Sequence, residues 1–235
     1  MIDIHSHFLP GVDDGARTFV DSIAILRELA SQGITDVVAT PHYVCETSYM
    51  SPYEYNAKLL EELKQKVALE DFKINIYLGN EIYIDEKILD LLSEGQITTV
   101  AGGKYLLAEL PLHEEFQNYE DVFKMLLDAG YKVILAHPER YEIIQKDYSI
   151  AKDLCGMGVL LQCNICSIVG KYGKEARKII RKLAKDKLIF AFGSDIHHYS
   201  QSNQLSVAQK KIAKYYSEEE LDKVFVKNPR KILRG

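Results

Sequence analysis

The chain has 235 residues, of which 47% are hydrophobic and 27% are charged, as is usual for a globular protein with a full apolar core. A formal net charge of −5 disfavours nucleic-acid binding as the main function, because that function usually needs a basic surface. No stretch approaches the roughly 20 apolar residues that span a bilayer, so we expect no membrane insertion. The first residues do not resemble a signal peptide, and we expect a cytoplasmic protein.

Short apolar runs alternate with amphipathic helical stretches along the whole chain. In chain order, the pattern predicts a strand at 1–5, a helix at 19–32, a strand at 36–40, a helix that begins near Ser51, a strand at 74–78, a helix at 86–93, a strand at 105–110, a helix at 121–129, a strand at 132–136, a helix at 149–157, a strand at 159–163, a helix at 173–185, a strand at 188–193 and two closing helices. Ser51 with Glu54, and Ser217 with Glu220, have the spacing of helix capping boxes.

The seven predicted strands are mostly continuous in apolar character, which is typical of a parallel sheet covered on both faces. No Ser/Gly-rich linker and no change in composition divides the chain, so a single domain over 1–235 is expected. The number of repeats favours a closed or nearly closed barrel of βα units, related to the TIM barrel. An open doubly wound α/β sheet fits the same pattern.

The cysteines give little sign of chemistry. Cys163 and Cys166 form a single CxxC, which is a weak zinc signal, and we expect reduced, buried cysteines in a strand and the turn after it. An arginine does not follow any of the four cysteines at the Cys-x5-Arg spacing, so a cysteine-based tyrosine phosphatase is excluded.

Gly170-Lys171 resembles the end of a nucleotide-binding P-loop. However, Ile165 occupies the position of the required first glycine and Tyr172 the position of the Ser or Thr. Nucleotide binding through this segment is therefore disfavoured.

Histidines and carboxylates recur where the predicted strands end. The residues at or just beyond these ends are His5, His7, His42, Glu81, Glu109, His137, Asp195 and His197. In a parallel βα barrel all strand C-termini open on one face, so residues far apart in sequence meet there. Imidazoles and carboxylates together bind Zn²⁺, Mn²⁺ or Fe²⁺. The sequence thus predicts a metal site. Nothing comparable singles out His113 or His198.

An ordered set of short motifs runs from Met1 to Asn228-Pro229-Arg230. Its members are Met1-Ile2-Asp3-Ile4-His5-Ser6-His7, Val12-Asp13-Asp14-Gly15, Thr40-Pro41-His42, Gly79-Asn80-Glu81, Glu109, His137-Pro138-Glu139-Arg140 and Ser194-Asp195-Ile196-His197. Together they resemble the polymerase-and-histidinol-phosphatase (PHP) superfamily. Within it they are most similar to the bacterial manganese-dependent protein-tyrosine phosphatases of capsule and exopolysaccharide operons.

The resemblance implies a distorted (β/α)7 barrel of PHP type that holds three divalent metal ions, most commonly Mn²⁺, with Fe or Zn as alternatives. Carried over by position, the first ion would be bound by His5, His7, Glu81 and Asp195. Glu81 would bridge to a second ion bound by Glu109 and His137. The third ion would be bound by Asp14, His42 and His197, with Asp13 as the alternative to Asp14.

The resemblance also implies an activity. The expected enzyme is a phosphoric monoester hydrolase that removes phosphate from phosphotyrosine on a bacterial tyrosine autokinase, by attack of a hydroxide that bridges the metal ions. Arg140 would contact the phosphate. Related tyrosine phosphatases often have a second arginine soon after the Asp-x-His motif, but residues 198–204 contain none. The second phosphate contact is therefore unassigned.

Two other functions fit the same residues. A histidinol-phosphatase-like enzyme, or another small-molecule phosphomonoesterase, would use the same ions on a different substrate. A non-catalytic, metal-binding regulatory domain would keep the ions without turnover. The sequence leaves the oligomeric state open.

Overall fold

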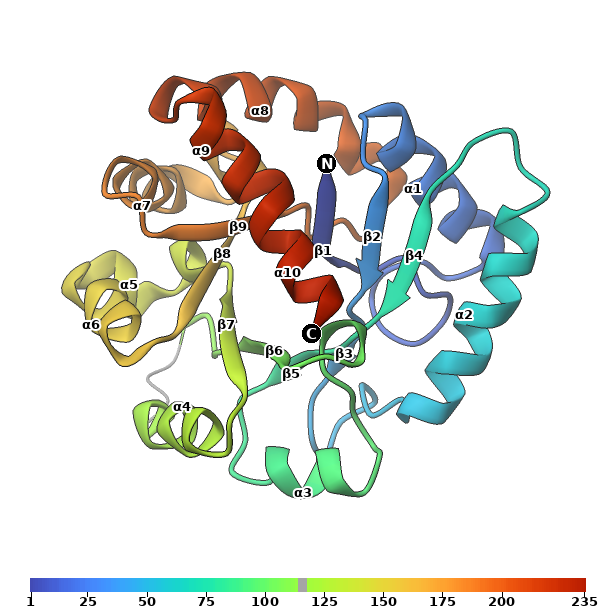
Figure 1. The fold of residues 1–235 in the computed structure, drawn as a ribbon, viewed down its shortest axis with the longest axis horizontal. Coiled ribbons are helices and arrows are strands. Elements are labelled where there is room, and N and C mark those ends of the chain that lie inside the picture. The colour runs from blue at the N-terminus through green and yellow to red at the C-terminus, as the bar shows by residue number, and fades with distance from the viewer. Residues whose placement is uncertain (114–117) are drawn as a thin grey trace.

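The computed structural model describes residues 1–113 and 118–235, without the side chains of residues 202 and 203. In these residues, nine short parallel strands form the centre of the protein. The strands are β1 (Ile2–Ser6), β2 (Asp36–Ala39), β3 (His42–Tyr43), β4 (Asn75–Leu78), β5 (Glu81–Tyr83), β6 (Tyr105–Glu109), β7 (Lys132–Ala136), β8 (Leu160–Asn164) and β9 (Ile189–Gly193). Figure 1 shows them around a common centre, with most helices outside.

Backbone hydrogen bonds divide the strands into a three-stranded sheet, β1-β2-β4, and a six-stranded sheet, β3-β5-β6-β7-β8-β9. The two sheets are joined where β1 meets the chain after β9: the Asp195 N–H donates to the His5 carbonyl at 3.0 Å, and the His7 N–H donates to the Ile196 carbonyl at 2.9 Å. The expected barrel-like arrangement of parallel βα units is thereby confirmed.

Two predicted strands are each followed by a second, shorter strand that the sequence pattern did not reveal. Thr40-Pro41 separates β2 from β3, and Gly79-Asn80 separates β4 from β5. Proline has no N–H to continue a ladder, and the Asn80 side chain donates to the Pro41 carbonyl at 3.2 Å. The breaks move β3 and β5 into the larger sheet, where His42 pairs directly with Glu81.

The helices follow the expected alternation. They are α1 (Phe19–Ser31), α2 (Tyr53–Val67), α3 (Ile88–Ser93), α4 (Tyr119–Asp128), α5 (Glu142–Lys146), α6 (Ser149–Met157), α7 (Gly173–Lys185), α8 (Leu205–Ile212), α9 (Glu218–Asp222) and α10 (Asn228–Arg234). Short 3-10 turns include η1 (Val100–Gly102), η2 (Pro138–Arg140), η3 (Ile165–Val169), η4 (Tyr199–Gln204) and η5 (Ala213–Tyr215), and a π-helical turn, η6 (Lys223–Lys227), joins α9 to α10. Helix α5 was not expected. None of the described helices has both the length and the apolar character needed to cross a bilayer.

One predicted capping box is confirmed and the other is wrong. Ser217 caps α9 reciprocally with Glu220. Helix α2 begins at Tyr53, whose N–H donates to the Gln96 carbonyl. Pro52 occupies the N-cap position and makes no side-chain hydrogen bond to the helix. Ser51 is thus one position too early to cap the helix, and its hydroxyl donates to the Asn56 side chain at 2.6 Å.

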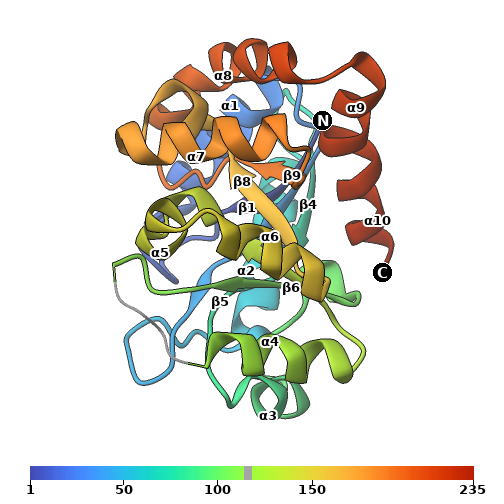
Figure 2. The same cartoon turned by 90° about the vertical axis from the view of Figure 1, so that its left-hand side faces the viewer.

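A small inner core fills the barrel beneath the strand C-termini. It comprises Ile2, Ile4, Val38, Val100, Leu107, Ile134, Ala136, Ala191 and Ile232. Ile232 comes from α10, which lies on the same side of the sheets as both termini (Figure 2). The Asn228 side chain, also in α10, donates a hydrogen bond to the Phe190 carbonyl in β9. A larger core lies between strands and outer helices. The interior is therefore closed at one end and polar at the other.

The two cysteines of the CxxC are free and buried, as expected. Cys163 lies in β8 and Cys166 in η3.

Candidate metal centre

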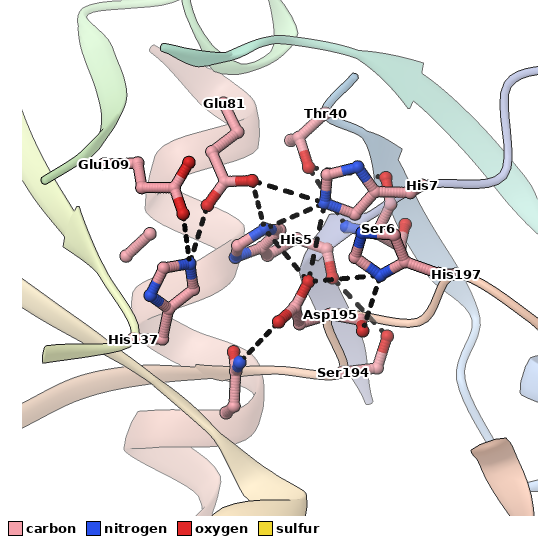
Figure 3. A network of polar contacts seen from close by, with 12 residues as sticks. His5, Ser6, His7, Thr40, Glu81, Glu109, His137, Ser194, Asp195 and His197 are labelled. Atoms are coloured by element: carbon pink, nitrogen blue, oxygen red, sulfur yellow. Dashed lines mark hydrogen bonds and ion pairs between the residues drawn. The ribbon is translucent and has the colours of Figure 1, made fainter. Parts of the chain in front are cut away.

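All nine predicted ligands lie in one cluster at the C-terminal ends of the strands, and Figure 3 shows most of them. Each has a side-chain ligand atom within about 3.5 Å of another member; they are His5, His7, Asp14, His42, Glu81, Glu109, His137, Asp195 and His197. His5 and His7 are adjacent on the same side of β1 and its continuation, with their Nε2 atoms 3.2 Å apart. Strands β3, β5 and β6 and the segments that follow β1, β7 and β9 supply the other members.

Glu81 lies at the middle of the cluster and is completely buried. Its Oε2 atom is 3.0 Å from Nδ1 of His42, 3.2 Å from Nε2 of His5 and 3.3 Å from Nε2 of His7, yet it accepts no hydrogen bond with adequate geometry. A buried carboxylate oxygen without a partner is strongly destabilising unless something else neutralises it. Three imidazole nitrogens converging on such an oxygen fit a bound divalent cation.

Two further groups of ligand atoms adjoin Glu81. On one side, Nε2 of His137 is 2.8 Å from Oε1 of Glu81 and 3.5 Å from Oε1 of Glu109. On the other side, Oδ1 of Asp14 is 3.3 Å from Nε2 of His197 and 3.5 Å from Nε2 of His42.

The groups of ligand atoms that lie together in the structure overlap more than the three ligand sets that the family resemblance implied. The sets whose ligand atoms lie together are His5, His7 and Glu81; His42, Glu81 and Glu109; and His7, Asp14, His42 and His197. His42 is thus within reach of two groups, as is His7, whose ring stacks on that of His197 with centroids 4.0 Å apart. Neighbouring ions would therefore lie close enough to share ligands.

Burial and neighbouring charges strongly shift the pKa values of side chains in the cluster. Burial alone would lower the pKa of His5, but the Glu81 and Asp195 carboxylates outweigh it and raise that pKa to about 9. Burial and the Glu81 charge raise the pKa of Glu109 to about 8. The hydrogen bond from His197 lowers the pKa of Asp14 to about 2. Such opposed shifts within one cleft are typical of functional sites.

A surrounding shell fixes the orientation of both β1 histidines. Nδ1 of His5 is 2.6 Å from Oε1 of Gln162, and Nδ1 of His7 is 2.8 Å from Oδ2 of Asp13. Each oxygen holds the ring by its Nδ1–H and leaves Nε2 directed into the cluster. Asp13 also accepts hydrogen bonds from the N–H groups of Gly15 and His42. Asp13 thus acts as a positioning residue, while Asp14 faces the cluster.

Asp195 is held in the same way. Its Oδ2 accepts hydrogen bonds from Arg140 at 3.0 Å, Asn164 at 2.6 Å and Tyr172 at 3.2 Å. Its Oδ1 is left to face His5 and His7, at 3.7 and 3.5 Å.

The backbone is constrained at two of these positions. His137 and Asp195 have left-handed φ values of 32° and 48°, which are unfavourable for residues with a Cβ. Gly15 is required by close packing, because a Cβ there would be 2.0 Å from the His7 carbonyl oxygen. The loop that carries Asp13 and Asp14 therefore lies directly against the end of β1.

Gln162, Asn164 and Tyr172 were not predicted as site residues from the sequence. Gln162 and Asn164 had a readable signal, because they alternate with Cys163 in β8 and so point to the same side of the strand. Tyr172 lies in a loop and had none. His113 and His198, which were not singled out, lie outside the cluster and contact Glu142 and Ser200 at the surface.

An open cavity of about 790 Å³ lies over the cluster. Its floor includes Asp14, His42, Glu109, His137, Asp195 and His197, and its walls include Val44, Tyr49, Tyr83, Leu112, Arg140, Lys171 and Tyr172. This volume is within the range of small-molecule sites. Arg140 lines the cavity and is paired with Asp195 at the edge of the cluster.

Comparison with known proteins agrees with this geometry. Residues 1–234 match the family described as "Capsular polysaccharide synthesis, CpsB/CapC". The tyrosine-protein phosphatase YwqE of Bacillus subtilis is 32% identical over 203 residues, covering 86% of this chain and 80% of YwqE. The tyrosine-protein phosphatase CpsB of Streptococcus pneumoniae is 29% identical and covers 99% and 98% of the two chains.

A crystal structure from a study of YwqE and CpsB, described as unique metal-dependent tyrosine phosphatases, superposes with a TM-score of 0.92 at 30% identity and covers 100% of this chain and 94% of the other. A Listeria monocytogenes structure described as "the putative histidinol phosphatase hisK" has a TM-score of 0.52 at 14% identity and covers 87% and 98% of the two chains. This likeness shows a shared fold alone. The chain belongs to the CpsB/CapC family of capsular polysaccharide synthesis.

Proposed function

We propose that this chain is a metal-dependent protein-tyrosine phosphatase. The observation that carries the proposal is the convergence of nine histidine and carboxylate side chains beneath an open cavity, around a Glu81 oxygen that lacks a hydrogen-bond donor. The relatives YwqE and CpsB are both named tyrosine-protein phosphatases, which supports phosphotyrosine as the substrate.

The proposed cofactors are three divalent ions, with Mn²⁺ as the native ion and Fe or Zn as alternatives. Three overlapping groups of ligand atoms support this number. The proposed ligands are His5, His7, Glu81 and Asp195 for the first ion, Glu81, Glu109 and His137 for the second, and Asp14, His42 and His197 for the third. When bound, the ions would lower the pKa of water at the site and neutralise charge on the phosphoryl oxygens.

The protein's own groups would bind and orient the ester. Arg140 has five N–H donors and uses one on Asp195, so others are available to the phosphoryl oxygens. The rings of Tyr49 and Tyr83 line the same cavity and offer an apolar surface to the phenyl ring of phosphotyrosine. Gln162 and Asp13 would keep the two β1 histidines in the orientation that ion binding needs.

The proposed partner is a phosphorylated bacterial tyrosine autokinase that regulates capsular or exopolysaccharide synthesis. The family's description supports a role in capsule synthesis. This substrate would place the reaction in the cytoplasm. We also propose that residues 1–235 form a single domain, since the family match spans nearly all of them.

The test is hydrolysis by the purified, Mn²⁺-loaded chain of three substrates: a phosphotyrosine peptide, an autophosphorylated bacterial tyrosine kinase and histidinol phosphate. We expect kcat/KM for the peptide to exceed that for histidinol phosphate by at least about tenfold, because a phenyl ring offers Tyr49 and Tyr83 more apolar surface than an imidazole ring does. Glu81→Gln should be nearly inactive, and the exposed Glu94→Gln should match the wild type.

Two results would overturn the proposal. A wild-type chain that releases no phosphate from the phosphotyrosine peptide is not a tyrosine phosphatase. Turnover that survives Glu81→Gln would mean that the cluster is not where the reaction occurs.

A further inference from the structure

Two cations lie against one aromatic ring on the wall of the cavity. Cζ of Arg140 is 4.5 Å, and Nζ of Lys171 is 4.8 Å, from the ring centroid of Tyr172. All three side chains line the cavity, together with Asp195 and His197 from the cluster. The cavity therefore has a positively charged wall next to the proposed ions.

The two cations differ in their partners. Arg140 is paired with Asp195. Lys171 has no carboxylate within ion-pair distance among the described residues, and it donates a hydrogen bond to a neutral acceptor, Oε1 of Gln201, at 3.3 Å. Lys171 is half-buried, and this burial lowers the pKa of its ammonium although the charge of Asp195 acts in the opposite direction. A partly buried cation without a carboxylate in direct contact favours an anionic ligand.

Gln201 also fixes where this ammonium lies. The same Oε1 atom accepts a hydrogen bond from the His197 N–H at 3.0 Å. Lys171 is thereby tied, through one amide oxygen, to the backbone of a proposed ligand. The Tyr172 hydroxyl donates to Asp195, the carboxylate that also pairs with Arg140, and this bond holds the ring next to Arg140.

We propose that Lys171 is a second phosphate-binding residue, which contacts the phosphoryl group of the substrate together with Arg140. The inference rests on the proposed function. An ammonium has three N–H donors, so two remain beyond the contact to Gln201. The segment that follows His197 contains no arginine, and the second cation is instead supplied by the loop between η3 and α7. This also gives a role to Lys171, whose segment lacks the first glycine and the Ser or Thr of a P-loop.

The experiment measures binding of inorganic phosphate to the Mn²⁺-loaded protein by calorimetry, in parallel with steady-state hydrolysis of a phosphotyrosine peptide. The variants are Lys171→Met, which removes the charge at similar length, and Lys171→Arg, which keeps it. Lys174→Met is the matched control, because Lys174 is exposed and does not line the cavity.

We expect Lys171→Met to weaken phosphate binding about tenfold or more, as the loss of a charge-assisted hydrogen bond does, and to raise KM more than it lowers kcat. Lys171→Arg should bind phosphate within about threefold of the wild type, because it preserves the charge. Lys174→Met should be unchanged.

The proposal is overturned if Lys171→Met binds phosphate as tightly as the wild type, or if Lys171→Arg is as weak as Lys171→Met, since the charge would then not be what matters. A wild-type chain that binds phosphate but hydrolyses no phosphotyrosine would refute the proposed function. The difference in phosphate affinity between Lys171→Met and the wild type would still decide the role of Lys171.

Discussion

The substitution Asp13→Asn tests how the metal centre is positioned without removing a proposed ligand. Oδ2 of Asp13 accepts hydrogen bonds from Nδ1 of His7 and the His42 N–H, and Oδ1 accepts one from the Gly15 N–H. Asparagine has one acceptor oxygen. If this oxygen keeps the two bonds at the Oδ2 position, the amide NH₂ must face the Gly15 N–H, and a donor meets a donor.

The expected magnitude follows from these contacts. Hydrogen bonds to a charged acceptor contribute roughly 1.5–3 kcal/mol, so the substitution weakens two such bonds and breaks a third. Changes around metal-bound histidines commonly reduce metal affinity by about 10–100-fold, which corresponds to about 1.4–2.8 kcal/mol. We expect Asp13→Asn to lower Mn²⁺ affinity by this factor while the chain remains folded.

The assay is Mn²⁺ titration of metal-free protein in competition with a chelating dye. Asp147→Asn is the matched control, because Asp147 also accepts bonds from a backbone N–H and a hydroxyl, both of Ser149, but is exposed. Wild-type affinity in Asp13→Asn would refute the positioning role. An equal loss in Asp147→Asn would show that the effect is not specific to the site.

Three further outcomes are expected. Chelation of the ions should abolish phosphatase activity and lower the Tm, because bound ions stabilise only the folded state, and added Mn²⁺ should restore both. Gly15→Ala should reduce Mn²⁺-dependent activity by more than about 100-fold, since its Cβ would be 2.0 Å from the His7 carbonyl oxygen and the ligand loop must move; retained activity would contradict this. Cys163→Ala should keep activity within about threefold, because no cysteine acts as a nucleophile, whereas complete loss in a folded variant would favour cysteine chemistry.

Most of the barrel was predictable, because each long strand is a continuous apolar run between amphipathic helices. Strands β3 and β5 were not, since elements of two or three residues have no detectable period. The cap of α2 was placed one residue early, because Ser51 fits the capping pattern but Pro52 is the residue that precedes the first helical turn.

The proposed metal ligands were more predictable than the strand breaks and loops that position the residues around them. His42 and Glu81 could be grouped from sequence because parallel strands end on a common face, whatever their separation along the chain. Their direct pairing across β3 and β5 depends on the breaks in two strands, which the pattern did not reveal. Lys171 reaches the cavity through a loop, and loops have no periodicity from which to infer direction.

The most direct test of the account is phosphate release from a phosphotyrosine peptide while metal-free protein is titrated with Mn²⁺. We predict no release without the metal, and activity that rises until more than one ion is bound per chain, because the ligand atoms form several adjacent groups. Hydrolysis that is independent of added metal, or none at any Mn²⁺ concentration, would contradict the account.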